Sequence, residues 1–269
     1  MPVQTMHTRT RLSGLDDTQR ARFEESGFLV LPGFLPDDLV TRVKQEVDTW
    51  VDTGLRARSI ASALAYDTHG VPDVMEFDLP AHGELLAHEP LLQVVGELLG
   101  PGFGFHHMHS DRHAPDLPGK GWHHDYEQSV QSRRTHTMLH ALHYLDGIDS
   151  DMAGLAVLPG SHREVAGKTA CAHLGTSVLP GEVYLEELPA GSTVLLHSAL
   201  FHARRAKPEF PGRPRYFVDA SYCQAGTAWP PVKPYWREML ARARQLGLAG
   251  PHWPDLFAEH HFSEYTKPE

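Results

Sequence analysis

The sequence has few cysteines, no long apolar run and no excess of basic charge, and each of these absences excludes a class of protein. With only two cysteines, Cys171 and Cys223, a disulfide framework is not expected and a reducing cytoplasm is the expected location. No apolar run approaches the length of a membrane span, and no apolar segment follows the basic residues of positions 1–11. We therefore expect neither an anchor nor a secretory signal. The net charge of -10 argues against a nucleic-acid-binding surface.

What the sequence does contain is the composition of one soluble domain. Hydrophobic residues make up 41% and charged residues 22% of the 269 positions, which is the balance of a globular protein with a large core. We see no internal repeat, and we predict a single domain spanning residues 1–269. The 20 histidines are many for this length and favour a metal site without locating it. The composition leaves the oligomeric state open.

The first part of the chain, residues 15–100, predicts a helical scaffold. Apolar side chains at Leu39, Val43 and Val47 recur at the spacing of one helix face. Residues 59–81 show no such period, and we assign no structure to them. The predicted elements are a short helix that ends before Ser26-Gly27 and is capped by Asp16 or Asp17, a buried strand at 28–31, and helices at 36–51 and 85–99.

Between about residues 103 and 222 the pattern changes to short apolar runs separated by turn signals. Many short strands without intervening helices predict an antiparallel sandwich or barrel, so the fold class is mainly β with flanking helices. Residues 229–269 form a tail with a predicted helix at 235–246, which we expect to pack outside the barrel rather than across its mouth. The predicted strands are 103–110, 135–145, 155–158, 183–188, 192–196 and 215–222.

The stretch Gly-Trp-His-His-Asp-Tyr at 121–126 carries the strongest chemical signal. His123 and Asp125 are two residues apart, so on an extended segment both side chains leave the same face and can reach one ion. His202, far downstream, could supply a third ligand. Two imidazoles and one carboxylate on one face of an octahedral metal leave the opposite face open, which suits iron(II) that must also take a co-substrate and dioxygen.

Further segments accompany this motif in a fixed order. They are FEESGFLV at 23–30, WHHD at 122–125, GLAVLPGSH at 154–162, PAGSTVLLH at 189–197, His202, and RPR at 213–215. Together they resemble the phytanoyl-CoA dioxygenase family of iron(II)/2-oxoglutarate oxygenases, whose fold is a double-stranded β-helix, or jelly roll. One departure is Ala153, where the family often has asparagine before the glycine.

The resemblance implies a role for each matching residue. His123, Asp125 and His202 would be the ligands of iron(II), with 2-oxoglutarate and dioxygen as co-substrates. An arginine that opens the strand after the distal histidine would hold the C5 carboxylate of 2-oxoglutarate. We predict Arg215 for this role, with Arg213 as the competitor, because a permanently charged planar fork can grip a carboxylate with two hydrogen bonds.

The activity implied by the resemblance is hydroxylation of an unactivated C–H bond with release of succinate and carbon dioxide, and we expect the substrate to be a small polar metabolite or natural product. The carboxylate of Asp125 argues against a halogenase, in which a halide takes the place of this ligand. Three alternatives stay open: the same chemistry ending in desaturation or ring closure, a non-oxidative zinc or manganese enzyme on a cupin-like barrel, and a binding protein without activity. The sequence does not identify the substrate.

Other polar residues near these motifs have structural alternatives. His140 and His143 would point to opposite faces of a strand, so that one of them could contact substrate. Arg204 and Arg205 could bind an anionic substrate or be solvated, and we leave the choice open. Structural roles are expected for the remaining histidines near the motifs: His106, His107, His109, His124, His162 and His197.

Overall fold

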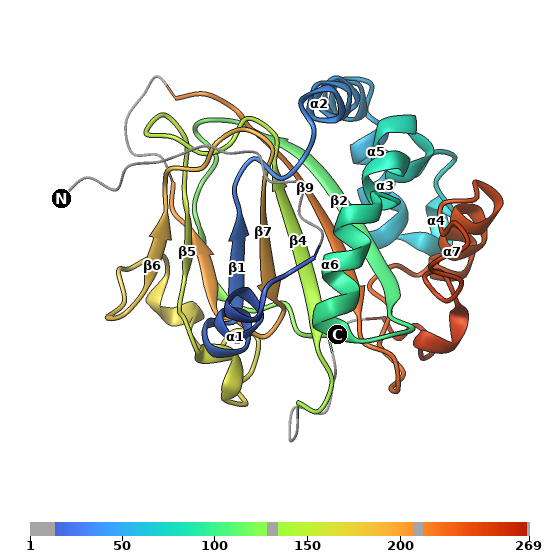
Figure 1. Cartoon of the computed structure of the whole chain (residues 1–269). Helices are drawn as coiled ribbons and strands as arrows, with labels where there is room; N and C mark the ends of the chain where they lie inside the picture. Colours follow the sequence, from blue (N-terminus) through green and yellow to red (C-terminus); the bar gives the residue numbers. More distant parts are fainter. Residues whose placement is uncertain (1–13, 128–133, 207–211, 268–269) are drawn as a thin grey trace.

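The computed structural model describes residues 14–127, 134–206 and 212–267. Residues 1–11, for which we expect no targeting signal, lie outside this part. The described chain forms two antiparallel sheets with helices gathered on one side (Figure 1). This confirms the predicted jelly-roll class with flanking helices. Among the described residues, no helix is both long and apolar enough to cross a bilayer.

The larger sheet has five strands. Its order is β1-β7-β4-β9-β2. The predicted core range of 103–222 therefore leaves out β1, which comes from the amino-terminal scaffold and pairs with β7. The strands are β1 (Phe28–Leu31), β2 (Gly104–His113), β4 (Met138–Tyr144), β7 (Ser192–His197) and β9 (Arg215–Cys223).

The smaller sheet has four short strands in the order β3-β8-β5-β6. Apolar side chains from both sheets, among them Leu142 of the larger sheet and Leu155 of the smaller, form one buried cluster. The strands are β3 (Lys120–His123), β5 (Leu155–Val157), β6 (Val183–Leu185) and β8 (His202–Arg204).

Residues of β9 alternate between the two faces of the larger sheet, as a strand requires. Val218 and Ala220 belong to the buried cluster that includes the helices. Phe217 and Asp219 line a cavity on the other face. The scaffold helices therefore support the sheet from outside and leave its inner face available for chemistry.

Seven α-helices and four 3-10 turns complete the described chain. Helix α2 shows why the scaffold forms, because Leu39, Val43 and Val47 are buried on one face while Asp37 and Asp38 lie in its first turn, where the helix dipole favours them. The helices are α1 (Asp17–Ser26), α2 (Asp37–Asp52), α3 (Leu55–Leu64), α4 (Tyr66–His69), α5 (Pro80–Leu86), α6 (Glu89–Leu99) and α7 (Trp236–Gln245), and the 3-10 turns are Glu76–Asp78, Ser161–Arg163, Ala172–Leu174 and Glu259–His261.

Two predictions for the scaffold are corrected by the structure. The predicted helix at 85–99 is two helices, since α5 ends at Leu86 and α6 begins at Glu89; Pro90 lacks the N–H that a continuous helix would need at that position. The segment 59–81, to which we assigned no structure, contains most of α3 and all of α4. The buried residues of α3 are Ser59 and Ser62, so this helix has no apolar period to detect.

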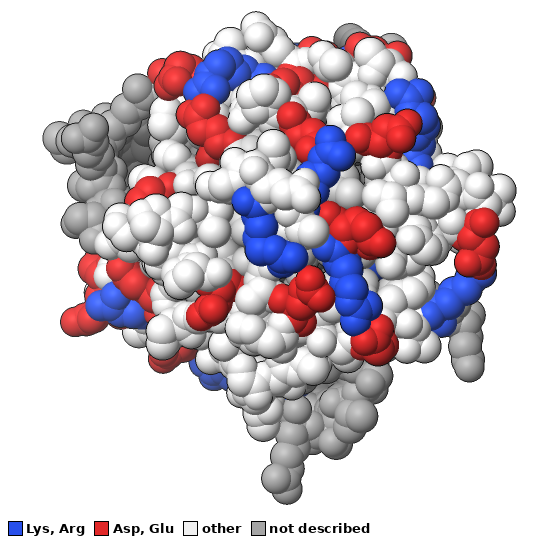
Figure 2. Space-filling view, turned by 90° about the vertical axis from the view of Figure 1, so that its right-hand side faces the viewer, with Lys and Arg blue, Asp and Glu red and all other residues white. Residues whose placement is uncertain are grey.

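The tail packs against the scaffold and not over the cavity. Arg242 of α7 pairs with Asp78 at 2.6 Å, and the ring centroid of Trp253 lies 5.2 Å from that of Phe103. No described residue after Asp219 lines the cavity. Figure 2 shows the side of the molecule that lies to the right in Figure 1. On this face acidic and basic side chains are intermixed rather than gathered by sign.

Candidate metal centre

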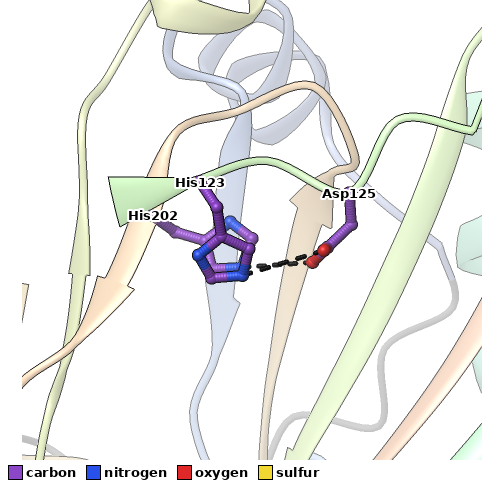
Figure 3. Close-up of side chains that lie close together, drawn as sticks. All are labelled: His123, Asp125 and His202. Atoms are coloured by element: carbon purple, nitrogen blue, oxygen red, sulfur yellow. Dashed lines mark ion pairs between the residues drawn. The ribbon is translucent and has the colours of Figure 1, made fainter. Parts of the chain in front are cut away.

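The three predicted ligands meet between two paired strands. His123 ends β3 and His202 begins β8, and the two residues are register partners across the antiparallel pair. Asp125 follows on the loop after β3, where its backbone N–H donates to the carbonyl of Ser198 at 2.7 Å. Figure 3 shows the two imidazole rings side by side with the carboxylate facing them. One ligand atom from each residue lies within 4.8 Å of the other two.

Backbone carbonyls fix the orientation of both imidazoles. Nδ1–H of His123 donates to the carbonyl of Gly121 at 2.7 Å, and Nδ1–H of His202 donates to the carbonyl of Leu200 at 3.0 Å. Each ring therefore presents Nε2 to the shared point, as a metal-ligating histidine does. Nε2 of His123 lies 3.7 Å from Oδ1 of Asp125, and Nε2 of His202 lies 3.2 Å from Oδ2.

The protonation states suit a metal site. Burial, and then the neighbouring His202, lower the pKa of His123 to about 4, so this imidazole is neutral near pH 7 and its Nε2 lone pair is available. Burial opposes ionisation of Asp125, but hydrogen bonding and electrostatic interaction with the neighbouring histidines, His202 first, outweigh this and hold the pKa of Asp125 well below its ordinary value. Nε2 of His123 is buried and has no hydrogen-bond partner within the described protein. A divalent cation would satisfy all three groups, and the donor set fits iron(II).

All three residues open into one cavity of about 700 Å³ between the sheets. This is within the usual size range of small-molecule sites. The inner face of β2, β4 and β9 supplies much of the opposite wall. The three residues therefore face a wall built largely from strands rather than from loops alone.

The two candidate arginines lie in different surroundings. Arg215 is 7% exposed and lines the cavity that contains the three ligands. The side chain of Arg213 is 51% exposed, pairs with Asp149 and does not line that cavity. Burial lowers the pKa of the Arg215 guanidinium, because a charge in a poorly solvated position is destabilised.

The family model for phytanoyl-CoA dioxygenase (PhyH) matches residues 23–207. This chain belongs to the phytanoyl-CoA dioxygenase family. Family membership makes it an iron(II)- and 2-oxoglutarate-dependent dioxygenase. A search of curated protein sequences finds no significant match.

Solved structures of similar fold include three enzymes of low sequence identity. HygX from Streptomyces hygroscopicus, with nickel and 2-oxoglutarate bound, is 19% identical with a TM-score of 0.60, covering 81% of this chain and 90% of its own. The epimerase SnoN from nogalamycin biosynthesis is 17% identical with a TM-score of 0.60, covering 80% and 83%. EctD from S. alaskensis, with 2-oxoglutarate and 5-hydroxyectoine, is 19% identical with a TM-score of 0.59, covering 83% and 81%.

The arginine end of the cavity in this family member contains residues that the sequence did not single out. His113, at the end of β2, accepts hydrogen bonds at Nδ1 from Arg215 at 3.1 Å and from Arg204 at 3.0 Å. Its Nε2 lies 3.1 Å from Oδ2 of Asp111. Two guanidinium groups are thus joined through one imidazole. The available signal was the two-residue alternation His107, His109, Asp111, His113, which places all four on one face of β2.

Of the other histidines, His124 and the pair His140 and His143 lie as the sequence predicts, whereas His107 and His109 do not. His124 points away from the metal centre, with Nε2 2.9 Å from the carbonyl of Ala166. His140 lines the cavity, whereas His143 of the same strand does not. His107 and His109, for which we expected structural roles, also line the cavity.

The two arginines that follow His202 differ in their surroundings. Arg204 lines the cavity, and its side chain also donates to the carbonyl of Pro118 at 2.7 Å. Arg205 instead pairs with Glu182 at 2.5 Å and lies over the ring of Tyr184. Only the first of them can therefore contact a molecule bound in the cavity.

Proposed function

We propose that this family member hydroxylates an unactivated C–H bond of a small polar metabolite or natural product and converts 2-oxoglutarate to succinate and carbon dioxide. The proposal assigns His123, Asp125 and His202 as ligands of iron(II) and Arg215 as the residue that binds 2-oxoglutarate. When bound, iron(II) supplies the activation of dioxygen that couples decarboxylation of the co-substrate to oxidation of the substrate.

The observation that carries the proposal is an arginine buried without a counter-ion in the cavity of the three ligands. Among the described residues, no carboxylate lies within ion-pair distance of Arg215. Its Nη1 donates to the carbonyl of Ala153 at 2.8 Å, and its buried Nε has no partner. An uncompensated buried charge is strongly unfavourable. A dicarboxylate that reached the metal with one end and this guanidinium with the other would supply the missing anion.

Each of these protein groups has a separate role in the proposed reaction. Backbone carbonyls hold the imidazoles of His123 and His202 with Nε2 toward the cavity, and Asp125 supplies an anionic oxygen on the same side. Arg215, stacked near the rings of Tyr144 and Phe217, holds the far carboxylate of the co-substrate. Leu142, Leu155 and Phe217 add apolar side chains to a cavity lining that is otherwise largely polar, and a bound substrate would pack against them.

Hydroxylation is proposed over four alternatives. Halogenation would need the position that Asp125 occupies. A non-oxidative metalloenzyme or a binding protein would have no use for a buried cation that matches a co-substrate carboxylate. Desaturation or ring closure is the alternative outcome, because solved structures of the same fold include an epimerase and a carbocyclase. The cytoplasmic location stays a prediction from the cysteine content.

Anaerobic titration of the apoprotein with iron(II) and then 2-oxoglutarate tests the proposal. We expect a weak visible charge-transfer absorption band that requires both additions, because the co-substrate must chelate the metal through its keto acid end. Succinate formation on admission of air gives a second readout. A protein that binds iron(II) but gives neither the band nor succinate would contradict the proposed function and favour the non-oxidative metalloenzyme.

A further inference from the structure

The cavity has two chemically different ends, and β9 spans both. Arg215, Phe217 and Asp219 all line the cavity from this strand. Residues four apart on a strand are separated by about 13 Å, so the guanidinium and the carboxylate begin at positions well separated along the wall, with the aromatic ring between them. If Arg215 takes the co-substrate, the space near Asp219 is available to the primary substrate.

The far end is built around a buried pair, His140 of β4 and Asp219. Nδ1 of His140 lies 2.8 Å from Oδ2 of Asp219 and 2.9 Å from Oγ of Ser221. Because a carboxylate only accepts hydrogen bonds, Nδ1 carries a proton. The imidazole is held in a fixed orientation with Nε2 directed away from its partners.

Nε2 of His140 is the unsatisfied atom of this pair. The side chain is 4% exposed and lines the cavity, and its buried Nε2 has no hydrogen-bond partner among the described residues. Burial opposes protonation, but the charge of Asp219 and the hydrogen bond to it raise the pKa of His140 to about 9. Near pH 7, Nε2–H is therefore a donor without an acceptor.

The surroundings of this pair are polar, and they include the charges of Asp125 near His140 and of Lys233 near His107 and His109. The imidazolium of His140 is compensated by Asp219, and Glu127, which also lines the cavity, pairs with Lys168 at 2.8 Å. His107 and His109 are half-buried, and desolvation is the main cause that lowers the pKa of each. Their neutral imidazoles each offer one donor and one acceptor.

This arrangement suits a hydroxyl group better than an ion or an apolar group. One hydroxyl can accept from Nε2–H of His140 while a neighbouring hydroxyl of the same molecule donates to a carboxylate oxygen of Asp219. An anion would be placed beside the carboxylate and a cation beside the imidazolium. An apolar group would leave the buried N–H unsatisfied.

We propose that His140 and Asp219 bind a neutral, hydroxyl-rich substrate of the cyclitol or sugar class at the end of the cavity opposite Arg215. This inference rests on the proposed function, because it assigns the arginine end to the co-substrate. It adds the chemical class of the primary substrate and the two side chains that select it.

His143 provides a matched control on the same strand. It is buried, its Nδ1 lies 2.8 Å from Oγ1 of Thr193, and its Nε2 also lacks a partner in the described structure. It does not line the cavity. His143→Leu and His140→Leu thus remove similar buried groups from opposite faces of β4, and only the second should alter substrate binding.

The test measures binding to protein loaded with nickel(II) and 2-oxoglutarate by titration calorimetry. The probes are a hydroxyl set of cyclitols and pyranosides, including myo-inositol and methyl glucoside, and two ionic probes of similar size, hexanoate and hexylamine. We expect saturable binding from the hydroxyl set and at least about tenfold weaker binding in His140→Leu. Because that variant could fail to fold, Asp219→Asn is the second variant, and it should also weaken binding since it replaces one acceptor oxygen with a donor and removes the charge that keeps His140 protonated.

Each outcome decides the question. Binding by the hydroxyl set that is lost in Asp219→Asn and kept in His143→Leu supports the inference. Tighter binding of hexanoate or hexylamine, no binding by any member of the hydroxyl set, unchanged affinity in Asp219→Asn, or equal losses in His140→Leu and His143→Leu would overturn it. A wild-type protein without the iron(II)/2-oxoglutarate band contradicts the proposed function instead, whereas a normal band with no polyol binding contradicts this inference alone.

Discussion

The two faces of the five-stranded sheet carry different chemistry although they alternate along the same strands. On β4, Leu139 and Ala141 pack into the cluster that joins the sheet to the helices, while His140 faces the cavity. On β9, Val218 contributes to that cluster and Asp219 to the cavity. Residues that pack against the helices thus alternate with residues that face the cavity. Substitutions at neighbouring positions should therefore change either stability or ligand binding, and the two effects should be separable.

The largest expected effect comes from the metal centre, where adjacent histidines face opposite ways. His123→Ala should abolish succinate formation because it removes an iron ligand, and Asp125→Ala and His202→Ala should do the same. His124→Ala should retain iron binding, although it removes a buried hydrogen bond. Iron content and 2-oxoglutarate turnover are the measurements, and near-normal turnover in any of the three ligand variants would refute the assignment.

The second largest effect is expected on 2-oxoglutarate affinity, where Arg215 and Arg213 should differ. Arg215→Ala should weaken 2-oxoglutarate binding about tenfold to hundredfold, since a charge-assisted carboxylate contact is lost. Arg213→Ala should leave it nearly unchanged because that side chain pairs with Asp149 at the surface. The charge-transfer band, titrated with 2-oxoglutarate at fixed iron(II), gives both affinities. A larger loss in Arg213→Ala would reverse the assignment.

A substitution on the helix side of β4 should show the opposite behaviour. Leu139 is fully buried, and Leu139→Ala should lower the free energy of unfolding by about 2–5 kcal/mol through lost burial and a residual cavity. The affinity of the folded protein for 2-oxoglutarate should stay at its wild-type value. Denaturant unfolding and the band titration together check this, and a large loss of affinity would show that the two faces are not separable.

The smallest effect is expected at the amino-terminal end of the first helix, which does not line the cavity. Asp16 caps α1, with Oδ1 accepting from the backbone N–H of Gln19 at 2.7 Å. Asp16→Ala should destabilise the fold by about 1 kcal/mol without changing turnover of the folded protein. Thermal unfolding and succinate formation, measured on one preparation, separate the two quantities; a changed turnover number would connect α1 to the active site.

The sequence was sufficient to predict what depends on local chemistry and periodicity. The helix at 36–51 and the strand at 28–31 follow from apolar spacing, and the structure has α2 and β1 there. His123, Asp125 and His202 could be chosen because a metal needs particular donors, and the structure places them together. Their role as iron ligands remains an assignment for experiment.

What could not be predicted depends on partners distant in the chain. Strands β3 and β8 have four and three residues, too few for a pattern, and their polar residues serve the site rather than a core. In the sequence Asp219 is one polar residue of a strand, and only the fold brings it next to His140. His113 acquires its place only from arginines that follow it by about a hundred positions.

The pairing of β3 with β8 has a consequence for the lifetime of the protein in a cell. β3 lies at the edge of the smaller sheet, and its register with β8 is irregular between Lys120 and His123. A metal ion shared by His123 and His202 would tie this edge to its neighbour, and metal at a hundredfold excess over its Kd adds about 2.7 kcal/mol to the native state. Among the described residues, the outer side of β3 is covered only by a loop, through hydrogen bonds from the backbone N–H groups of Trp122 and His124 to the carbonyls of Gly175 and Lys168. Iron starvation would therefore loosen an edge strand of the kind at which proteolysis and aggregation begin.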